Sequence, residues 1–93
     1  MIRVTFAVSG TMREYFDQEE YRLELPDGAN LGDLLARIGQ DHGARLTESI
    51  WKREDHRFRG AVVLMVGTKA VKDRAMTLVD GQTVKAFKAV VGG

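Results

Sequence analysis

The chain has 93 residues, of which 44% are hydrophobic and 29% charged, and its formal net charge is +1. This predicts one domain with one modest core and excludes the strongly basic footprint of a nucleic-acid binder. The absence of cysteine excludes a disulfide framework, thiol catalysis and a zinc-thiolate site. No apolar run approaches the roughly 18 residues of a membrane span, and the N-terminus does not resemble a signal peptide, so we expect a cytoplasmic protein.

Two segments with alternating hydrophobicity open the chain. Residues 2–8 (IRVTFAV) and 20–25 (EYRLEL) each place their larger apolar side chains on one face, which predicts two strands. Between them, residues 11–16 (TMREYF) have the spacing of a short helical turn, with apolar positions at Met12, Tyr15 and Phe16. We expect the two strands to pair antiparallel across this turn.

The clearest helix signal follows Pro26-Asp27-Gly28. Asn30 is a favourable N-cap, Asp33 stands where the acid of a capping box would be, and Gly43 marks the end. The apolar stripe that should face the core consists of Leu31, Leu34, Leu35 and Ile38. Residues 44–55 are expected to add another helical turn or two, and residues 56–60 an exposed loop.

The last third of the chain predicts further strands. Residues 61–66 (AVVLMV) form a continuous apolar run, typical of a strand covered on both faces, and Gly67 ends it. A short extended piece is expected near residues 70–71, and Asp80-Gly81 forms a turn before the last strand, TVKAFKAV. One helix crossing a mixed sheet favours an α+β, β-grasp architecture, with the first and last strands parallel at the centre.

Few residues suggest catalysis. His42 near a helix end is interpreted as a dipole contact and His56 as solvated, and neither belongs to a metal-ligand motif. The charged run around Trp51 favours a solvated surface over a docking patch. The remaining candidate is the C-terminal pair Gly92-Gly93, expected to be a flexible tail after a domain of residues 1–91. Without Cβ atoms, this pair could enter a narrow channel beside a nucleotide.

The chain resembles the MoaD/ThiS family of ubiquitin-like sulfur-carrier proteins. The resemblance lies in IRVTFAV and TMREYF, in LPDGANLGDLLARI, and in LVDGQTVKAF with the final Gly-Gly. Two positions depart from the family: Val66-Gly67 stands where Asn-Gly is common, and the residues before the terminal pair lack the prolines of molybdopterin members. The second departure weakens assignment to the molybdopterin branch.

The resemblance implies a cosubstrate rather than an enzyme. A ubiquitin-activating-type adenylyltransferase would use ATP to adenylate the Gly93 carboxylate, and a sulfur donor would convert it to a thiocarboxylate for a sulfur-acceptor enzyme. No bound cofactor or metal is implied. The acceptor stays open among molybdopterin, thiazole, cysteine and other metabolites. The alternatives are a ubiquitin-like modifier joined through Gly93 to lysines, and a binding module with an inert tail.

A docking surface is expected beside the tail. If Val84 and Ala86 face the helix, alternation places Lys85 and Phe87 on the other face of the last strand. Phe87 would then be a partner anchor, with Lys85, Val90 and Val91 as further partner-binding residues. In the opposite register, Phe87 would belong to the core.

Overall fold

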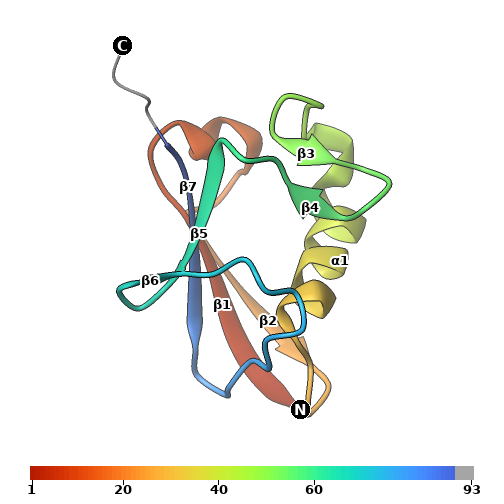
Figure 1. Cartoon of the computed structure of the whole chain (residues 1–93), viewed down its shortest axis with the longest axis vertical. Helices are drawn as coiled ribbons and strands as arrows, with labels where there is room; N and C mark the ends of the chain where they lie inside the picture. Colours follow the sequence, from red (N-terminus) through yellow and green to blue (C-terminus); the bar gives the residue numbers. More distant parts are fainter. Residues whose placement is uncertain (90–93) are drawn as a thin grey trace.

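A five-stranded mixed sheet and one main helix form the protein. The computed structural model describes residues 1–89 (Figure 1), so the expectations for Val90, Val91, Gly92 and Gly93, and for a domain boundary after residue 91, lie outside the described residues. In spatial order, the strands are β2 (Glu20–Leu25), β1 (Ile2–Val8), β7 (Thr83–Lys88), β5 (Val62–Val66) and β6 (Lys69–Ala70).

The connectivity is that of a β-grasp. β1 pairs antiparallel with β2 and parallel with β7, and β7 pairs antiparallel with β5. The α+β architecture and the central, parallel first and last strands are therefore confirmed. The turn before β7 has Gly81 at a φ of 85°, a left-handed conformation that glycine adopts without strain.

Helix α1 (Leu31–His42) begins with the predicted capping box. The Asn30 side chain accepts a hydrogen bond from the Asp33 N–H at 2.8 Å, and the Asp33 carboxylate accepts one from the Asn30 N–H at 2.9 Å. These two bonds satisfy backbone donors that the first helical turn leaves without partners. Gly43 follows the helix in a right-handed conformation and starts the 3-10 turn η2 (Gly43–Arg45).

The core lies between α1 and one face of the sheet. The predicted helix stripe is buried, with Leu34 at 0% and Leu35 at 3% exposure. It packs against the inward residues of the three strands nearest the sheet centre, among them Val4, Phe6, Leu64, Val84 and Ala86. No helix within residues 1–89 is long and apolar enough to cross a membrane.

The segment after α1 differs from the expectation. Instead of further α-helical turns and an exposed loop, the chain forms η2 and then a small hairpin of β3 (Trp51–Lys52) and β4 (Arg57–Phe58). Trp51 pairs directly with Phe58, and their ring centroids lie 4.9 Å apart. Trp51 is 2% exposed, so it anchors the hairpin to the core. Aromatic pairing across two short strands outweighed the helical spacing of residues 44–55.

The connection from β1 to β2 contains the predicted turn, here the 3-10 helix η1 (Gly10–Tyr15). The Tyr21 hydroxyl fixes the chain that follows, because it donates to the Asp17 carboxylate and accepts from the N–H groups of Asp17 and Gln18. This hydrogen bond lowers the pKa of Asp17, while burial and the same bond raise the pKa of Tyr21. The ring centroid of His42 lies 4.6 Å from that of Tyr21 and 5.2 Å from that of Phe16. His42, at the end of α1, therefore packs against the start of β2 and the residue that follows η1.

Candidate functional site on the open face of the sheet

The alternation along β7 is the predicted one. Val84 and Ala86 are fully buried toward α1, whereas Lys85 is exposed and Phe87 is half-buried on the opposite face. The register in which Phe87 would be a core residue is therefore wrong. Since α1 packs on the other side of the sheet, β7 presents Phe87 on the face away from α1 (Figure 1).

Two side chains of β5 extend this apolar surface. Val63 lies directly opposite Phe87, and Met65 lies directly opposite Lys85. Both are half-buried, and paired residues of neighbouring strands project from the same face of a sheet. On the other side of β7, Ala7 of β1 is the partner of Lys85. We refer to Ala7, Val63, Met65 and Phe87 as the open-face patch.

The open-face patch corrects the interpretation of residues 61–66. Their continuous apolar run predicted a strand covered on both faces, with Met65 in the core. In the structure, Val62 and Leu64 are buried, whereas Val63 and Met65 remain half-buried on the open face. The single main helix covers only one face of the sheet. Side chains alternate along a strand, so every second residue of β5 points to the face away from that helix. The apolar character of Val63 and Met65 makes this part of the sheet a candidate docking surface.

Polar residues border the open-face patch near the start of η1. A hollow of about 390 Å³ lies between β1, η1 and the start of β2, and Lys85 and Arg13 are among its lining residues. Arg13 forms an ion pair with Glu19 at 3.0 Å. Among residues 1–89, Lys85 has no ion-pair partner within 4.0 Å, so it is available at the edge of the patch.

The sheet holds the chain at least as far as Ala89, the last described residue. The Ala89 N–H donates to the Ala61 carbonyl at 2.7 Å, one residue beyond the end of β7. Four residues of the sequence follow, ending in Gly92-Gly93. Fully extended, four residues span at most about 14 Å. Any enzyme that acts on the Gly93 carboxylate must therefore bring its reactive atoms within about that distance of Ala89, next to the open-face patch.

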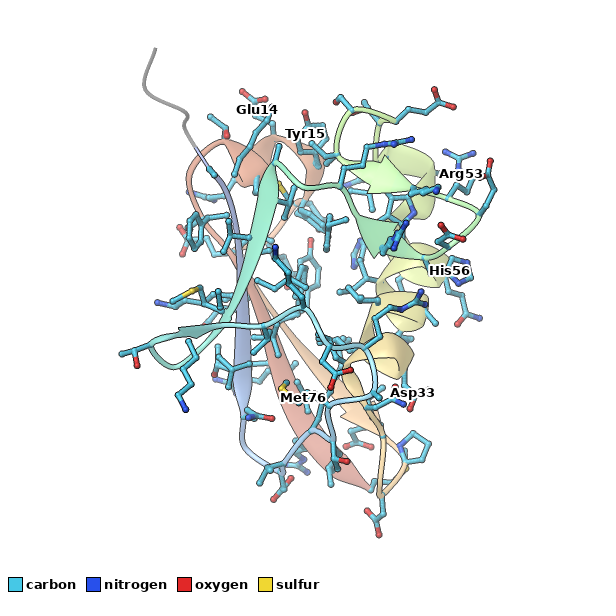
Figure 2. The ribbon with its side chains drawn as sticks, in the orientation of Figure 1. Glu14, Tyr15, Asp33, Arg53, His56 and Met76 are labelled. Atoms are coloured by element: carbon cyan, nitrogen blue, oxygen red, sulfur yellow. The ribbon has the colours of Figure 1, made fainter. Side chains whose placement is uncertain are left out.

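The histidines play no part in this site. His56 lies in the β3–β4 hairpin together with Arg53, well away from β7 (Figure 2). It is exposed, as predicted, and its ring stacks near Trp51 with a centroid separation of 6.5 Å. Within residues 1–89, no cluster of three or more His, Cys, Asp or Glu side chains could hold a metal ion.

Sequence reasoning placed Phe87 and Lys85 correctly on the face away from the helix, but it missed that Val63 and Met65 share this face. The sequence predicts a single main helix, and this could have identified the two residues. When a helix covers only one face of a sheet, every second residue of a central strand faces away from it. Applied to residues 61–66 with Val62 and Leu64 inward, this alternation identifies Val63 and Met65. Methionine suits such a surface, because its unbranched thioether adapts to differently shaped partners.

Comparison with known proteins gives structural matches only. No protein-family model matches the chain, and no curated protein matches its sequence. Solved structures do match over nearly the whole length. SAMP1 from Haloferax volcanii has a TM-score of 0.80 and 15% identity, covering 98% of this chain and 99% of that one.

Two further structures extend the likeness. A putative molybdopterin converting factor, subunit 1, from Pyrococcus furiosus has a TM-score of 0.73 and 22% identity, over 97% of this chain and 100% of that one. A chain of the BexX/CysO complex from Amycolatopsis orientalis has a TM-score of 0.63 and 19% identity, over 97% of this chain and 99% of that one. At these identities the likeness establishes the fold alone: the chain has the β-grasp, or ubiquitin-like, fold.

Proposed function

We propose that the chain is a ubiquitin-like sulfur carrier of the MoaD/ThiS type, whose reactive group is the Gly93 carboxylate. The observation that carries the proposal is the placement of the last strand. β7 lies at the sheet centre, is tied to the fold through Ala89, and is followed in the sequence by four residues that end in Gly92-Gly93. A rigid body thus delivers a short segment without bulky side chains at its final two positions.

The proposed chemistry needs no catalytic side chain from this protein. A carboxylate oxygen of Gly93 attacks the α-phosphorus of ATP in the activating enzyme, and pyrophosphate leaves. Hydrosulfide released by a sulfide donor then attacks the acyl carbon, the bond from this carbon to the AMP oxygen breaks, and AMP departs to leave a thiocarboxylate at Gly93. Glycine at positions 92 and 93 favours this reaction, since a Cβ would crowd a channel narrow enough to exclude water. In this proposal ATP serves the activating enzyme, and the carrier itself binds no cofactor or metal.

The open-face patch is the proposed docking surface for the activating and acceptor enzymes. It adjoins Ala89, so a partner that covers Phe87 and Val63 would hold the segment after Ala89 near its own active site. Apolar residues bordered by charges, here Lys85 and Arg13, match the usual anatomy of a protein interface. CysO was solved in a complex with BexX, which supports binding of another protein to this fold.

Phe87→Ala should weaken binding to the activating enzyme roughly thirtyfold, as expected for a central interface aromatic worth about 2 kcal/mol. The melting temperature should change little, because Phe87 is half-buried and lies outside the core between α1 and the sheet. Isothermal titration calorimetry and thermal unfolding measure the two effects on the same preparation.

Two control variants sharpen this measurement. Val79→Ala removes an apolar side chain that is 62% exposed outside the open-face patch, and it should leave partner affinity unchanged. Lys85→Ala should weaken binding less than Phe87→Ala does, and mainly by reducing the association rate and its salt dependence. Unchanged affinity in Phe87→Ala would show that the partner docks elsewhere, and unfolding would show that Phe87 contributes to the core after all.

The second candidate function is that of a protein modifier, joined through Gly93 to lysine side chains. One of the matching structures is described as small archaeal modifier protein 1 from Haloferax volcanii. The activation step is the same in both candidates, and only the nucleophile that receives the acyl group differs. A binding module with an inert tail would not be activated at all.

An ATP–pyrophosphate exchange assay tests the proposal. The full chain, ending at Gly93, is mixed with the ubiquitin-activating-type adenylyltransferase of its source organism, ATP and labelled pyrophosphate. The proposal predicts exchange that depends on the presence of the chain. Absence of exchange with an enzyme that activates another carrier in the same assay would favour the binding module.

A further inference from the structure

A second hollow lies on the opposite side of β5 from β7, far from any role in the proposed carrier chemistry. It is a groove of about 480 Å³. Its lining residues come from α1, the hairpin strands β3 and β4, residues 59–60, β5, β6 and the segment 71–74. Apart from Val63, it shares no residue with the open-face patch.

The floor of the groove is apolar. Its apolar lining includes Leu31 and Leu35 of α1, Val62 and Leu64 of β5, and also Phe58 and Val71. Phe58 and Val71 are half-buried and pack against the main core. The groove therefore gives a small apolar ligand access to the layer between helix and sheet.

The rim of the groove is cationic. Five of its lining residues are Lys or Arg and none is Asp or Glu; the five are Lys52, Arg57, Arg59, Lys72 and Arg74. The whole chain carries a net charge of only +1, so the remainder of the molecule is net negative. The positive charge is thus gathered around this apolar floor.

Three of the five cations are free to bind an anion. The other two form ion pairs with Asp55, whose carboxylate lies 3.1 Å from Lys52 Nζ and 3.5 Å from the Arg57 guanidinium. The hydrogen bond from Lys52 lowers the pKa of Asp55, and Arg57 and Arg74 lower it further. Among residues 1–89, Arg59, Lys72 and Arg74 have no ion-pair partner within 4.0 Å.

The segment that carries Lys72 and Arg74 is fixed in place. The Arg74 carbonyl accepts a hydrogen bond from the Gly32 N–H at 2.9 Å, and the Met76 carbonyl accepts one from the Leu31 N–H at 2.9 Å. Figure 2 shows Met76 beside the start of α1, where Asp33 is labelled. The Asp73 carboxylate accepts from the Ala75 N–H at 2.9 Å. The first turn of α1 thus anchors the lower wall of the groove.

We propose that this groove binds a small amphipathic anion, with an apolar body on the floor and a carboxylate or phosphate group held by Arg59, Lys72 and Arg74. Charge complementarity selects the anionic group, and the apolar floor selects the body. The groove has the volume of a small-molecule site. This proposal is independent of the carrier chemistry at Gly93.

Decanoate is a suitable probe, with decyl phosphate as the phosphate analogue and decanol as the uncharged control. Each is titrated into the isotopically labelled full chain below its micelle concentration, and binding is followed by amide chemical shifts. We expect saturable shifts at Val62, Leu64, Val71 and Arg74 with either anion, and at least about tenfold weaker binding of decanol. Comparing decanoate with decyl phosphate shows which anionic group the rim prefers.

Charge variants test the rim directly. The triple variant Arg59→Gln, Lys72→Gln, Arg74→Gln should bind decanoate at least about tenfold more weakly, with decanol binding unchanged. A control with the same change of net charge, Arg3→Gln, Arg13→Gln, Arg22→Gln, should bind decanoate like the wild type. All six side chains belong to exposed residues, so melting temperatures should stay close to that of the wild type.

Three outcomes would overturn the proposal. The first is equal affinity for decanol and decanoate, the second is an absence of shifts at the groove residues, and the third is equal weakening in the two triple variants. Because none of these measurements involves the activating enzyme or Gly93, their failure would leave the carrier proposal untouched.

Discussion

Removal of Gly93, or addition of one residue after it, should abolish ATP–pyrophosphate exchange and leave the fold intact. The reacting carboxylate would be displaced by one residue, about 3.3–3.6 Å, from the α-phosphorus of ATP. The structural core lies within residues 4–86, so the free energy of unfolding should change by well under about 1 kcal/mol. The exchange assay and thermal unfolding measure both quantities.

Gly92→Ala is a useful companion, since it keeps the length and adds a single Cβ. We expect it to lower the exchange rate, because a side chain would crowd the channel that receives the segment. Wild-type exchange in the variant that lacks Gly93 would contradict the carrier proposal and favour the binding module.

Leu35→Ala should lower the free energy of unfolding by roughly 2–5 kcal/mol, the cost of emptying a buried leucine site. Leu35 is 3% exposed and lies in the helix stripe that covers the sheet. Small domains have total stabilities of about 5–15 kcal/mol, so this one change would remove a large share. Chemical denaturation monitored by circular dichroism measures it.

Gln40→Ala is the matched control, because Gln40 is exposed on the same helix. Its effect on unfolding should stay within about 0.5 kcal/mol. A Leu35→Ala protein as stable as this control would show that the buried face of α1 is assigned incorrectly. Since Leu35 also lines the cationic groove, its loss should affect decanoate binding as well.

Local patterns predicted most of the fold. The alternation in residues 2–8 and 20–25 predicted β1 and β2, and the Asn30–Asp33 pair predicted the start of α1. These signals are reliable because each one depends only on residues close together in the sequence. The pleat of a strand, the cap of a helix and a single helical turn each involve only a few consecutive residues. The alternation in β7 likewise placed Phe87 on the face opposite Val84.

The features that sequence reasoning missed depend on distant contacts. The β3–β4 hairpin forms because Trp51 and Phe58 pair over the core, although residues 44–55 have a plausible helical spacing. The outward position of Met65 follows from the coverage of one sheet face only. The groove with the cationic rim is lined by both Arg59 and Arg74, and no local pattern in the sequence links these two residues.

The mass of the intact protein tests the central claim most directly. The full chain is incubated with its activating enzyme, ATP and a sulfide donor, and is then analysed by mass spectrometry. The carrier proposal predicts a species in which one oxygen is replaced by sulfur, located by fragmentation at Gly93 and absent when ATP is omitted. A chain that keeps its original mass under these conditions would contradict the proposal, and a chain found instead as adducts on lysines of other proteins would establish the modifier.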